Sequence, residues 1–275
     1  MTEHPLFKSS DSGLLLVFME PGAAVTLPEF HTWYDEEHVP LRIQRFTTFR
    51  SATRYAVTST ALTPTGVNNA PDSTWGAFYT ISDNSVFADS SYTSLRSERS
   101  EREAELFTRL AIVDRRIYRL EYDSDSDETI TVDRTKLGLA IQTEQATPTY
   151  IVTNSIDMID SASQEEYNKW FAEEHIPMLA KVKGWRRSRR FTLIDAGVNG
   201  TGKSGEEVVP KCLGLHEWDE APEEEEQYRV ACGTKWRKDV LGGEGEPKLV
   251  RRERKTCQLY RAWDPLAAIE AERKK

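Results

Sequence analysis

The chain has 275 residues and a formal net charge of −9, which disfavours nucleic acid as the main partner because phosphate binding needs clustered positive potential. No apolar run approaches the roughly 20 residues of a membrane span, and residues 1–13 lack the basic start and apolar stretch of a signal peptide. Three cysteines without metal-ligand spacing are typical of a reduced cytoplasmic protein. We therefore expect a cytoplasmic protein with no membrane or nucleic-acid partner, no metal and no cofactor.

The first half of the chain predicts a β-α-β-β-α-β series. The apolar run at residues 14–19 predicts a strand, and aromatic residues at helical spacing predict an amphipathic helix that closes near Pro40. Alternation over residues 47–58 and the run at 75–81 predict two more strands, separated by a loop rich in Pro, Asn and Gly. A long charged helix over residues 82–110 and a strand at 116–122 complete the series. This order is that of a ferredoxin-like domain.

An acidic segment then leads into a second series of the same kind. Strands are predicted at residues 150–156, 185–194, 212–218 and 254–263, and helices at 164–180 and 222–240. We therefore divide the chain into a first repeat at 13–123, a linker at 124–149 and a second repeat at 150–265.

An octapeptide occurs once in each half. Residues 33–40 read WYDEEHVP and residues 170–177 read WFAEEHIP, identical at five of eight positions and 137 residues apart. The same offset matches the apolar run at residues 14–17 with residues 151–154. A repeat of this length indicates two duplicated domains and not a solenoid.

With this topology and Trp-x-x-Glu-Glu-His-x-Pro in both halves, the chain resembles the dimeric α/β-barrel superfamily, and within it the EthD-domain proteins, whose first helix has a similar ending. The resemblance implies an α+β fold in which two four-stranded sheets face each other. In this tandem chain it implies a barrel closed within the chain, an intrachain pseudo-dimer that could pair further as a homodimer. It also implies cofactor-free chemistry on small, often aromatic or polyketide-like compounds of secondary metabolism, although several relatives have no demonstrated activity.

Four residues are candidates for acid–base chemistry. His38 and His175 end the octapeptide helices, where an imidazole can move protons near neutral pH or, alternatively, cap the helix C-terminus. His216 lies in the third strand of the second half, and Tyr79 occupies the matching place in the first half. Each carries a polar tip that can move a proton, and the alternative is plain core packing.

Substrate-binding candidates lie on the same elements. An inward Arg54 or Arg190 would orient a carboxylate or enolate, whereas the alternative is a solvated edge strand. Trp33 and Trp170 either line an aromatic substrate or pack the core. Asn154 replaces an apolar residue of the first half, so we expect acid–base chemistry mainly in the second half.

A phosphate-loop pattern occurs at residues 197–204, GVNGTGKS. Phosphate binding requires a helix directly after it, but Gly205 and Pro210 follow within six residues. We therefore expect a hairpin loop, and no ATP or GTP binding at Lys203.

Three functions are compatible with these observations. The first is a cofactor-independent lyase, isomerase or cyclase that acts on a small hydrophobic metabolite by His and Tyr acid–base chemistry. The second is a non-catalytic, small-molecule-binding or stress-type barrel protein. The third is a cofactor-free oxygenase of the anthrone type.

Overall fold

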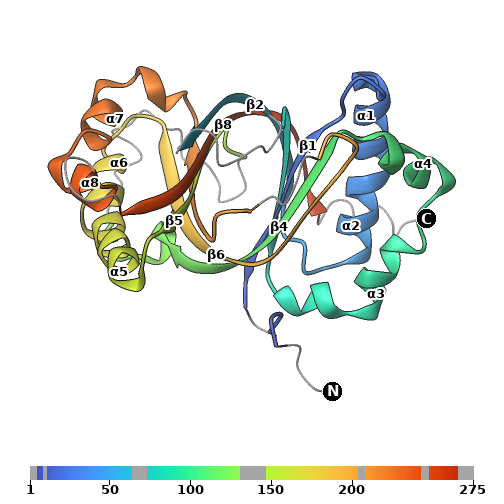
Figure 1. The fold of residues 1–275 in the computed structure, drawn as a ribbon, viewed down its shortest axis with the longest axis horizontal. Coiled ribbons are helices and arrows are strands. Elements are labelled where there is room, and N and C mark those ends of the chain that lie inside the picture. Colours follow the sequence, from blue (N-terminus) through green and yellow to red (C-terminus); the bar gives the residue numbers. More distant parts are fainter. Residues whose placement is uncertain are drawn as a thin grey trace.

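The computed structural model describes residues 5–8, 11–63, 73–130, 147–203, 208–242 and 248–265. Within them, eight strands form one closed antiparallel barrel (Figure 1). In barrel order, the strands are β1 (Gly13–Glu20), β3 (Trp75–Ile81), β2 (Ala52–Thr63), β8 (Leu249–Trp263), β5 (Tyr150–Met158), β7 (Cys212–Trp218), β6 (Trp185–Asn199) and β4 (Ile112–Asp123). The α+β class and the barrel closed within one chain agree with the prediction and are consistent with a dimeric α/β barrel.

Each half of the chain contributes four neighbouring strands to the barrel. The halves meet at two seams, where β2 pairs with β8 and β4 pairs with β6. The seam strands are long: β2 and β4 have 12 residues each, and β6 and β8 have 15 each. Because their far ends pair outside their own half, β6 and β8 extend beyond the ranges predicted from local alternation.

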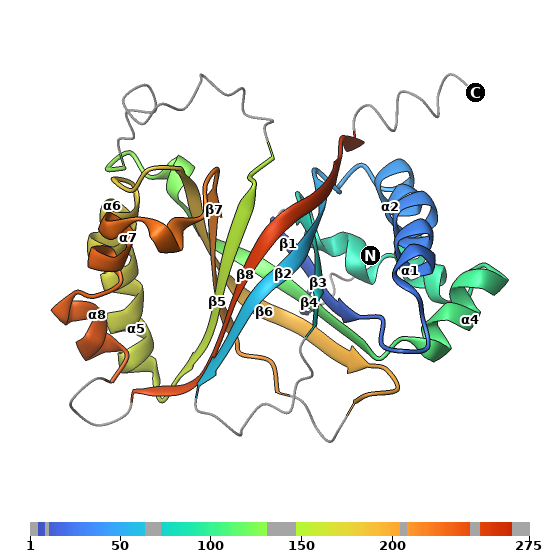
Figure 2. The same cartoon turned by 90° about the horizontal axis from the view of Figure 1, so that it is seen from above.

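Helices cover the barrel on two opposite sides, as Figures 1 and 2 show. The first layer contains α1 (Leu27–Trp33), α2 (Val39–Arg45), α3 (Ser90–Thr93) and α4 (Glu101–Arg109). The second layer contains α5 (Ser161–Trp170), α6 (Ile176–Leu179), α7 (Glu226–Ala231) and α8 (Lys235–Val240). No helix in the described part of the chain is long and apolar enough to cross a membrane.

The apolar runs of the strands are buried on both faces. In β1, Leu15 and Val17 pack under the first helix layer, whereas Leu14, Leu16 and Phe18 fill the inside of the barrel. Side chains of a strand alternate between the two faces of a sheet, so one continuous apolar run supplies both cores. A third cluster packs between the second helix layer and the sheet.

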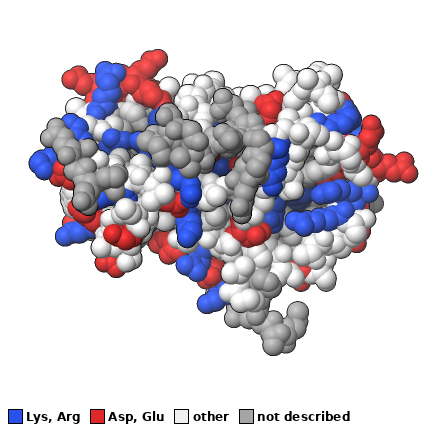
Figure 3. All heavy atoms as spheres, in the orientation of Figure 1, with Lys and Arg blue, Asp and Glu red and all other residues white. Residues whose placement is uncertain are grey.

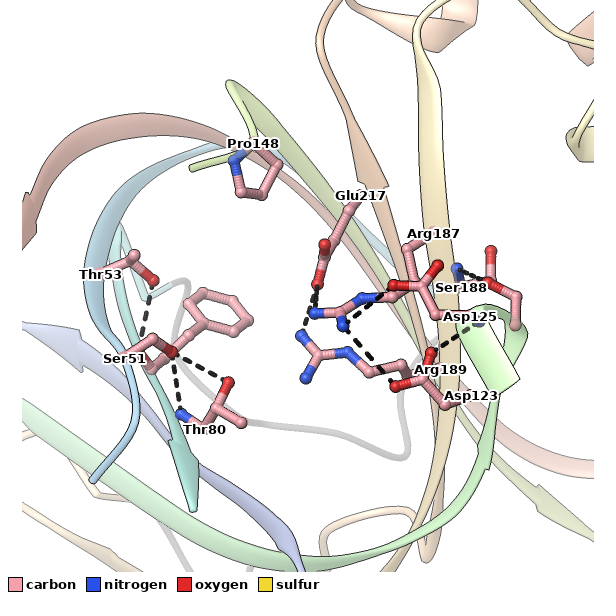
Figure 4. Close-up of polar contacts among 12 residues, drawn as sticks. Ser51, Thr53, Thr80, Asp123, Asp125, Pro148, Arg187, Ser188, Arg189 and Glu217 are labelled. Atoms are coloured by element: carbon pink, nitrogen blue, oxygen red, sulfur yellow. Dashed lines mark hydrogen bonds and ion pairs between the residues drawn. The ribbon is translucent and has the colours of Figure 1, made fainter. Parts of the chain in front are cut away.

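Charged side chains also lie inside the barrel. Arg116 bonds both Asp114 and Glu253, and all three are at most 5 % exposed. A second group joins Arg187 and Arg189 to Glu217, and Figure 4 shows the two guanidinium groups converging on this carboxylate. The barrel interior is thus an apolar core with buried ion pairs.

Two predicted helices are broken in the structure. Residues 82–110 form short 3₁₀ and α segments because Asp83, Asp89 and Ser100 each accept a backbone N–H bond through their side chains and start a new turn. The helix predicted at 222–240 is divided into α7 and α8, with Thr234 capping α8. Helix propensity and the order of charges along the segment do not predict these internal caps.

Basic and acidic side chains alternate over much of the face in Figure 3. Acidic ones gather at its upper left, over α7, where residues 223–226 are all Glu. Such a mixture is typical of a solvated surface.

Candidate functional site

The octapeptide of the first half forms a π-helical turn at Tyr34–His38 between α1 and α2. Val39 donates its N–H to the Tyr34 carbonyl, five residues back, and Pro40 follows at the start of α2, where a missing N–H costs least. The prediction that the helix closes near Pro40 is therefore wrong, since α2 continues to Arg45. The alternative of a C-terminal helix cap for His38 is wrong for the same reason.

The second octapeptide forms the same turn at Phe171–His175, and Ile176 donates to the Phe171 carbonyl. α6 follows at once, so His175 is not a C-terminal cap either. The wide turn directs both imidazoles into the helix–sheet layer, where His38 and His175 are each 7 % exposed. π-turns are frequent at functional sites.

Gly214 lies at the centre of the sheet face beneath the second π-turn. Its neighbours in register are Asn154 on β5 and Arg190 on β6. A Cβ atom added at Gly214 would lie 3.5 Å from both His216 Nε2 and the Phe171 ring. The missing side chain therefore leaves the imidazole edge uncovered between an amide and a guanidinium group.

His216 is hydrogen-bonded through Ser188. The Trp185 indole N–H donates to Ser188 Oγ at 3.0 Å, and Ser188 Oγ lies 2.8 Å from His216 Nδ1. The Ser188 hydroxyl still has its own proton to donate to Nδ1, and in that tautomer the His216 proton is on Nε2. Burial, and secondarily Arg254, lowers the pKa of His216 to about 3, so the ring is neutral at pH 7.

His175 packs beside it. Its ring stacks on Trp170 with centroids 4.5 Å apart, and it meets His216 edge-to-face at 5.5 Å. Its Nδ1 is buried and has no hydrogen-bond partner among the described residues. Burial lowers the pKa of His175 well below its ordinary value, and the adjoining His216, Arg237 and Arg252 lower it further.

Two half-buried arginines face the same region. Arg190 donates to the Asn168 carbonyl at 3.4 Å, and Arg252 donates to Asn154 Oδ1 at 2.8 Å. Within the described ranges, neither has a carboxylate at ion-pair distance. Burial lowers the pKa of each guanidinium group, and in Arg252 the neighbouring Arg237 adds to the effect.

The Tyr167 hydroxyl lies among these groups. Burial raises the pKa of Tyr167, against the opposing influence of Arg252, Arg190 and a hydrogen bond with Asn154. Tyr167 is therefore a neutral phenol that can donate a hydrogen bond. Together these residues form a polar, positively charged patch on an otherwise apolar face.

The candidate residues of the first half, His38 and Tyr79, are hydrogen-bonded to neighbouring side chains. His38 Nδ1 lies 3.1 Å from Glu103 Oε1, and burial, with Arg42 in second place, lowers the pKa of His38 to about 4 against the influence of Glu103. The Tyr79 and Tyr34 hydroxyl groups are 3.5 Å apart, and burial raises the pKa of both. Tyr34 and Tyr79 are 1 % exposed and Trp33 is fully buried, so this imidazole is enclosed.

Arg54 is neutralised within the first half. It forms a buried ion pair with Asp35 and approaches His31 Nδ1 at 3.1 Å. Its guanidinium group lies over the Tyr34 ring at 4.3 Å and the Tyr260 ring at 5.1 Å. Arg54 is thus a partnered structural arginine and not the exposed edge residue of the alternative interpretation.

The structure brings His175, His216, Asn154, Trp170 and Arg190 into one region of the second half. The other candidates lie in the first half: Trp33 contacts His38 at 4.7 Å between ring centroids, and Tyr79 and Arg54 flank Tyr34.

Sequence reasoning missed Arg252 and the phenol of Tyr167. Arg252 belongs to the basic run at residues 251–255, a pattern that is typical of a solvated edge strand. The alternation of side chains along a strand is the signal that could have identified Arg252. In β8, Glu253 and Lys255 face the barrel interior, so Arg252 faces the helices. Among the described residues, no three His, Cys, Asp or Glu side chains are grouped as metal ligands.

The phosphate-loop pattern lies partly in β6, which ends at Asn199. The N–H groups of Thr201 and Gly202 donate to the carbonyls of Leu110 and Ala111, each at 3.0 Å. Gly200 has a φ of 131°, and a Cβ there would lie 2.1 Å from the Ala111 carbonyl oxygen. The glycines thus allow a close contact with the backbone of residues 110–111, and this contact uses two of the N–H groups of the loop. Ser204 lies outside the described residues.

No protein-family model and no curated protein matches the chain. Its fold is similar to several solved structures. An anthrone oxidase-like protein has 14 % identity, coverage of 93 % of this chain and 94 % of the other, and a TM-score of 0.48. A proposed monooxygenase of Fusobacterium nucleatum subsp. nucleatum has 11 % identity, coverage of 93 % and 95 %, and a TM-score of 0.49. A mutant chlorite dismutase of Candidatus Nitrospira defluvii has 11 % identity, coverage of 96 % of both chains, and a TM-score of 0.42. At such identities the likeness concerns the fold alone.

Proposed function

We propose that the protein is a cofactor-independent enzyme that moves a proton on a small hydrophobic, aromatic or polyketide-like compound, at the helix-covered face of its second half. One observation carries the proposal: the buried His175 Nδ1, which has no hydrogen-bond partner among the described residues, lies in the same region as Arg190 and Arg252, whose guanidinium groups donate to neutral oxygen atoms and have no carboxylate at ion-pair distance there. The matching groups of the first half are partnered, since His38 bonds Glu103 and Arg54 bonds Asp35. Buried polar groups without a protein partner are costly unless a ligand satisfies them.

The two imidazoles have different roles. In the tautomer in which Ser188 donates to Nδ1, the Nε2–H of His216 donates to a carbonyl oxygen of the substrate. His175 accepts a proton from the adjacent carbon, and the electron pair moves onto that oxygen to form an enolate. Return of the proton to another atom gives an isomerase, and expulsion of a leaving group gives a lyase. Cyclisation follows if the enolate carbon attacks a second carbonyl.

The low pKa of both imidazoles also supports a second function. An imidazole that is hard to protonate is a weak base, and such a site is able to bind a ligand without reacting with it. In the enzyme, the substrate changes this balance, since a developing enolate beside His175 favours the imidazolium form. A binding protein and an enzyme therefore differ in whether the bound compound exchanges its acidic proton.

The same proposal concerns the organisation of the chain. We propose that residues 13–123 and 150–265 are ferredoxin-like repeats of EthD type, joined by the linker at 124–149. The octapeptide turn in both halves and the contiguous strands of each half in the barrel support this division. The first repeat, with its enclosed His38 and Tyr79, has a structural role.

The experiment is hydrogen–deuterium exchange at the acidic carbon of α-tetralone in D₂O, followed by proton NMR with the full chain and with His216→Phe. We expect exchange above the buffer rate, lowered on the order of 10²-fold by the substitution. Binding of α-tetralone without exchange would identify a binding protein. Dioxygen uptake with anthrone as the probe, unaffected by exclusion of metals, would instead identify the oxygenase.

A further inference from the structure

We propose that the second-half site carries an anion subsite built from Arg190 and Arg252, and that its ligand is an aromatic compound bearing a carboxylate or an equally charged oxyanion. The location rests on the proposed function. The charge of the ligand is a separate inference, argued from how this chain treats its other inward-facing arginines.

The other arginines of the barrel strands have carboxylate partners among the described residues, whereas Arg42 on α2 donates to the His38 carbonyl. Arg116 bonds Asp114 and Glu253, Arg189 bonds Glu217, and Arg54 bonds Asp35. A buried cation without a counter-ion is costly, so such pairing is the rule. Arg190 and Arg252 depart from it, and Arg237, which donates to the Cys232 carbonyl, adds a third positive charge close to Arg252.

The first half has a carboxylate at the place where the second half has none. Arg54 and Arg190 occupy equivalent places, opposite Ala77 on β3 and opposite Gly214 on β7. Each lies against the first residue of a π-turn: Arg54 is 4.3 Å from the Tyr34 ring and Arg190 is 5.5 Å from the Phe171 ring. The next residue of the turn is Asp35 in the first half, and it supplies the carboxylate.

Position 172 of the second half is Ala, so the π-turn offers Arg190 no carboxylate. The two halves also match at the strands that cross the seams, where a tyrosine lies beside each of these arginines. The Tyr260 hydroxyl donates to Asp35 at 3.1 Å, and Tyr122, which lies 6.0 Å from the Arg190 guanidinium, occupies the equivalent place in the second half. Tyr122 donates instead to Asp127 at 2.8 Å. The first half has a built-in carboxylate at a place where the second half has none.

The surrounding groups select an oxyanion on a ring. Tyr167 and Asn154 stand between the two arginines and can donate hydrogen bonds to the same oxygen atoms. Phe171 and Trp170, both buried, are aromatic side chains that pack in the same cluster and would contact the ring of the ligand. The unpartnered Nδ1 of His175 lies under the positive potential of Arg252 and Arg237. A carboxylate there would satisfy the arginines and relieve that potential.

The probes are 1-naphthoate and its neutral isostere 1-naphthamide, titrated calorimetrically into the full chain. We expect naphthoate to bind and naphthamide to bind at least about 10-fold more weakly, because hydrogen bonds to charged groups contribute the most. Arg190→Gln and Arg252→Gln should each weaken naphthoate binding about 10- to 100-fold and leave naphthamide nearly unchanged. Ala172→Asp, which supplies the carboxylate of the first half, should abolish naphthoate binding.

The matched control is Arg45→Gln, which removes one positive charge from an exposed pair with Glu98 in the first half. It should change neither affinity, and circular dichroism should show all variants folded. Equal affinity for the two probes, absence of naphthoate binding, or unchanged binding in Ala172→Asp would overturn the anion subsite. His216→Phe separates the two proposals, because it should lower proton exchange on the order of 10²-fold and keep the preference for naphthoate. If the preference holds without any exchange in the wild type, the anion subsite stands and the acid–base function falls.

Discussion

Replacing Arg116 by Met should destabilise the barrel strongly, and more at neutral pH than in acid. The Arg116 side chain is 2 % exposed and bonds Glu253 Oε1 at 2.7 Å and Asp114 Oδ2 at 2.6 Å. Met keeps the apolar contact with Phe18 but leaves two buried carboxylates without this cation. Breaking a buried pair in this way costs about 3–5 kcal/mol in the free energy of unfolding, because uncompensated charge remains in the core.

The pH dependence follows from Glu253. Burial raises its pKa, but the Arg116 charge and hydrogen bonds outweigh burial, so the pKa in the folded protein is lowered. A lowered carboxyl pKa contributes stability that is present above the unfolded value of about 4.3 and is lost as the pH falls through the folded value. Without Arg116, burial dominates and raises the pKa, so protonation below neutral pH relieves the variant. The stability difference should therefore shrink as the pH falls from 7 towards 4.

The assay is urea unfolding followed by the fluorescence of the buried Trp33, Trp185 and Trp218, with midpoints compared at pH 7 and pH 4.5. Arg119→Met is the matched control, because Arg119 lies on the same strand in a solvent-exposed pair. It should cost about 0–1 kcal/mol. Similar losses in both variants, or a loss in Arg116→Met that does not change with pH, would refute the reasoning.

Three further predictions concern the two halves. His216→Phe should lower proton exchange on α-tetralone on the order of 10²-fold and Tyr79→Phe should not, both measured by NMR on folded protein. Equal losses of exchange, or a loss only from Tyr79→Phe, would contradict a site in the second half. In NMR titrations the rings of His38 and His216 should stay neutral from pH 8 down to pH 5.5, because their pKa values are about 4 and about 3; since unfolded His takes up its proton near pH 6.5, both rings make the fold less stable as the pH falls below that value. Cutting the chain between residues 130 and 147 and separating the pieces should expose the barrel-facing apolar side chains and cause unfolding or self-association; two stable, folded monomers in analytical ultracentrifugation would contradict the single barrel.

The fold followed from the sequence because its signals repeat. The offset of 137 residues and the apolar runs predicted the strands and the barrel closed within one chain. The π-turns could not be predicted, because Pro40 in a helical pattern normally marks a helix end. The broken helices also depend on single side chains, such as the Ser100 cap, which act only once the chain has turned.

The candidate site stays a prediction, and part of it follows from the sequence for a physical reason. His216 and Asn154 stood out since they replace Tyr79 and Val17 at the same offset, and polar replacements on an apolar face are visible in the sequence. Arg190 was a candidate because an inward arginine can orient a carboxylate, but Arg252 did not stand out, because its importance lies in the carboxylates that are absent around it. Whether a counter-ion is missing depends on all the residues that the fold brings to this face. No single residue type in the sequence predicts it.

The two seams explain how one half can specialise while the other keeps the fold. Each seam strand crosses to the other half, so that Tyr260 of β8 closes the first face over Arg54 and Tyr122 of β4 lies against Phe171 on the second. The first face therefore holds the barrel together through a network with its own carboxylate, Asp35, and that network includes a residue of the second half. Because this network supplies stability that does not depend on a ligand, the second face can keep two arginines without a carboxylate partner and the unpartnered Nδ1 of His175. A self-sufficient single domain would have less stability to tolerate this costly arrangement.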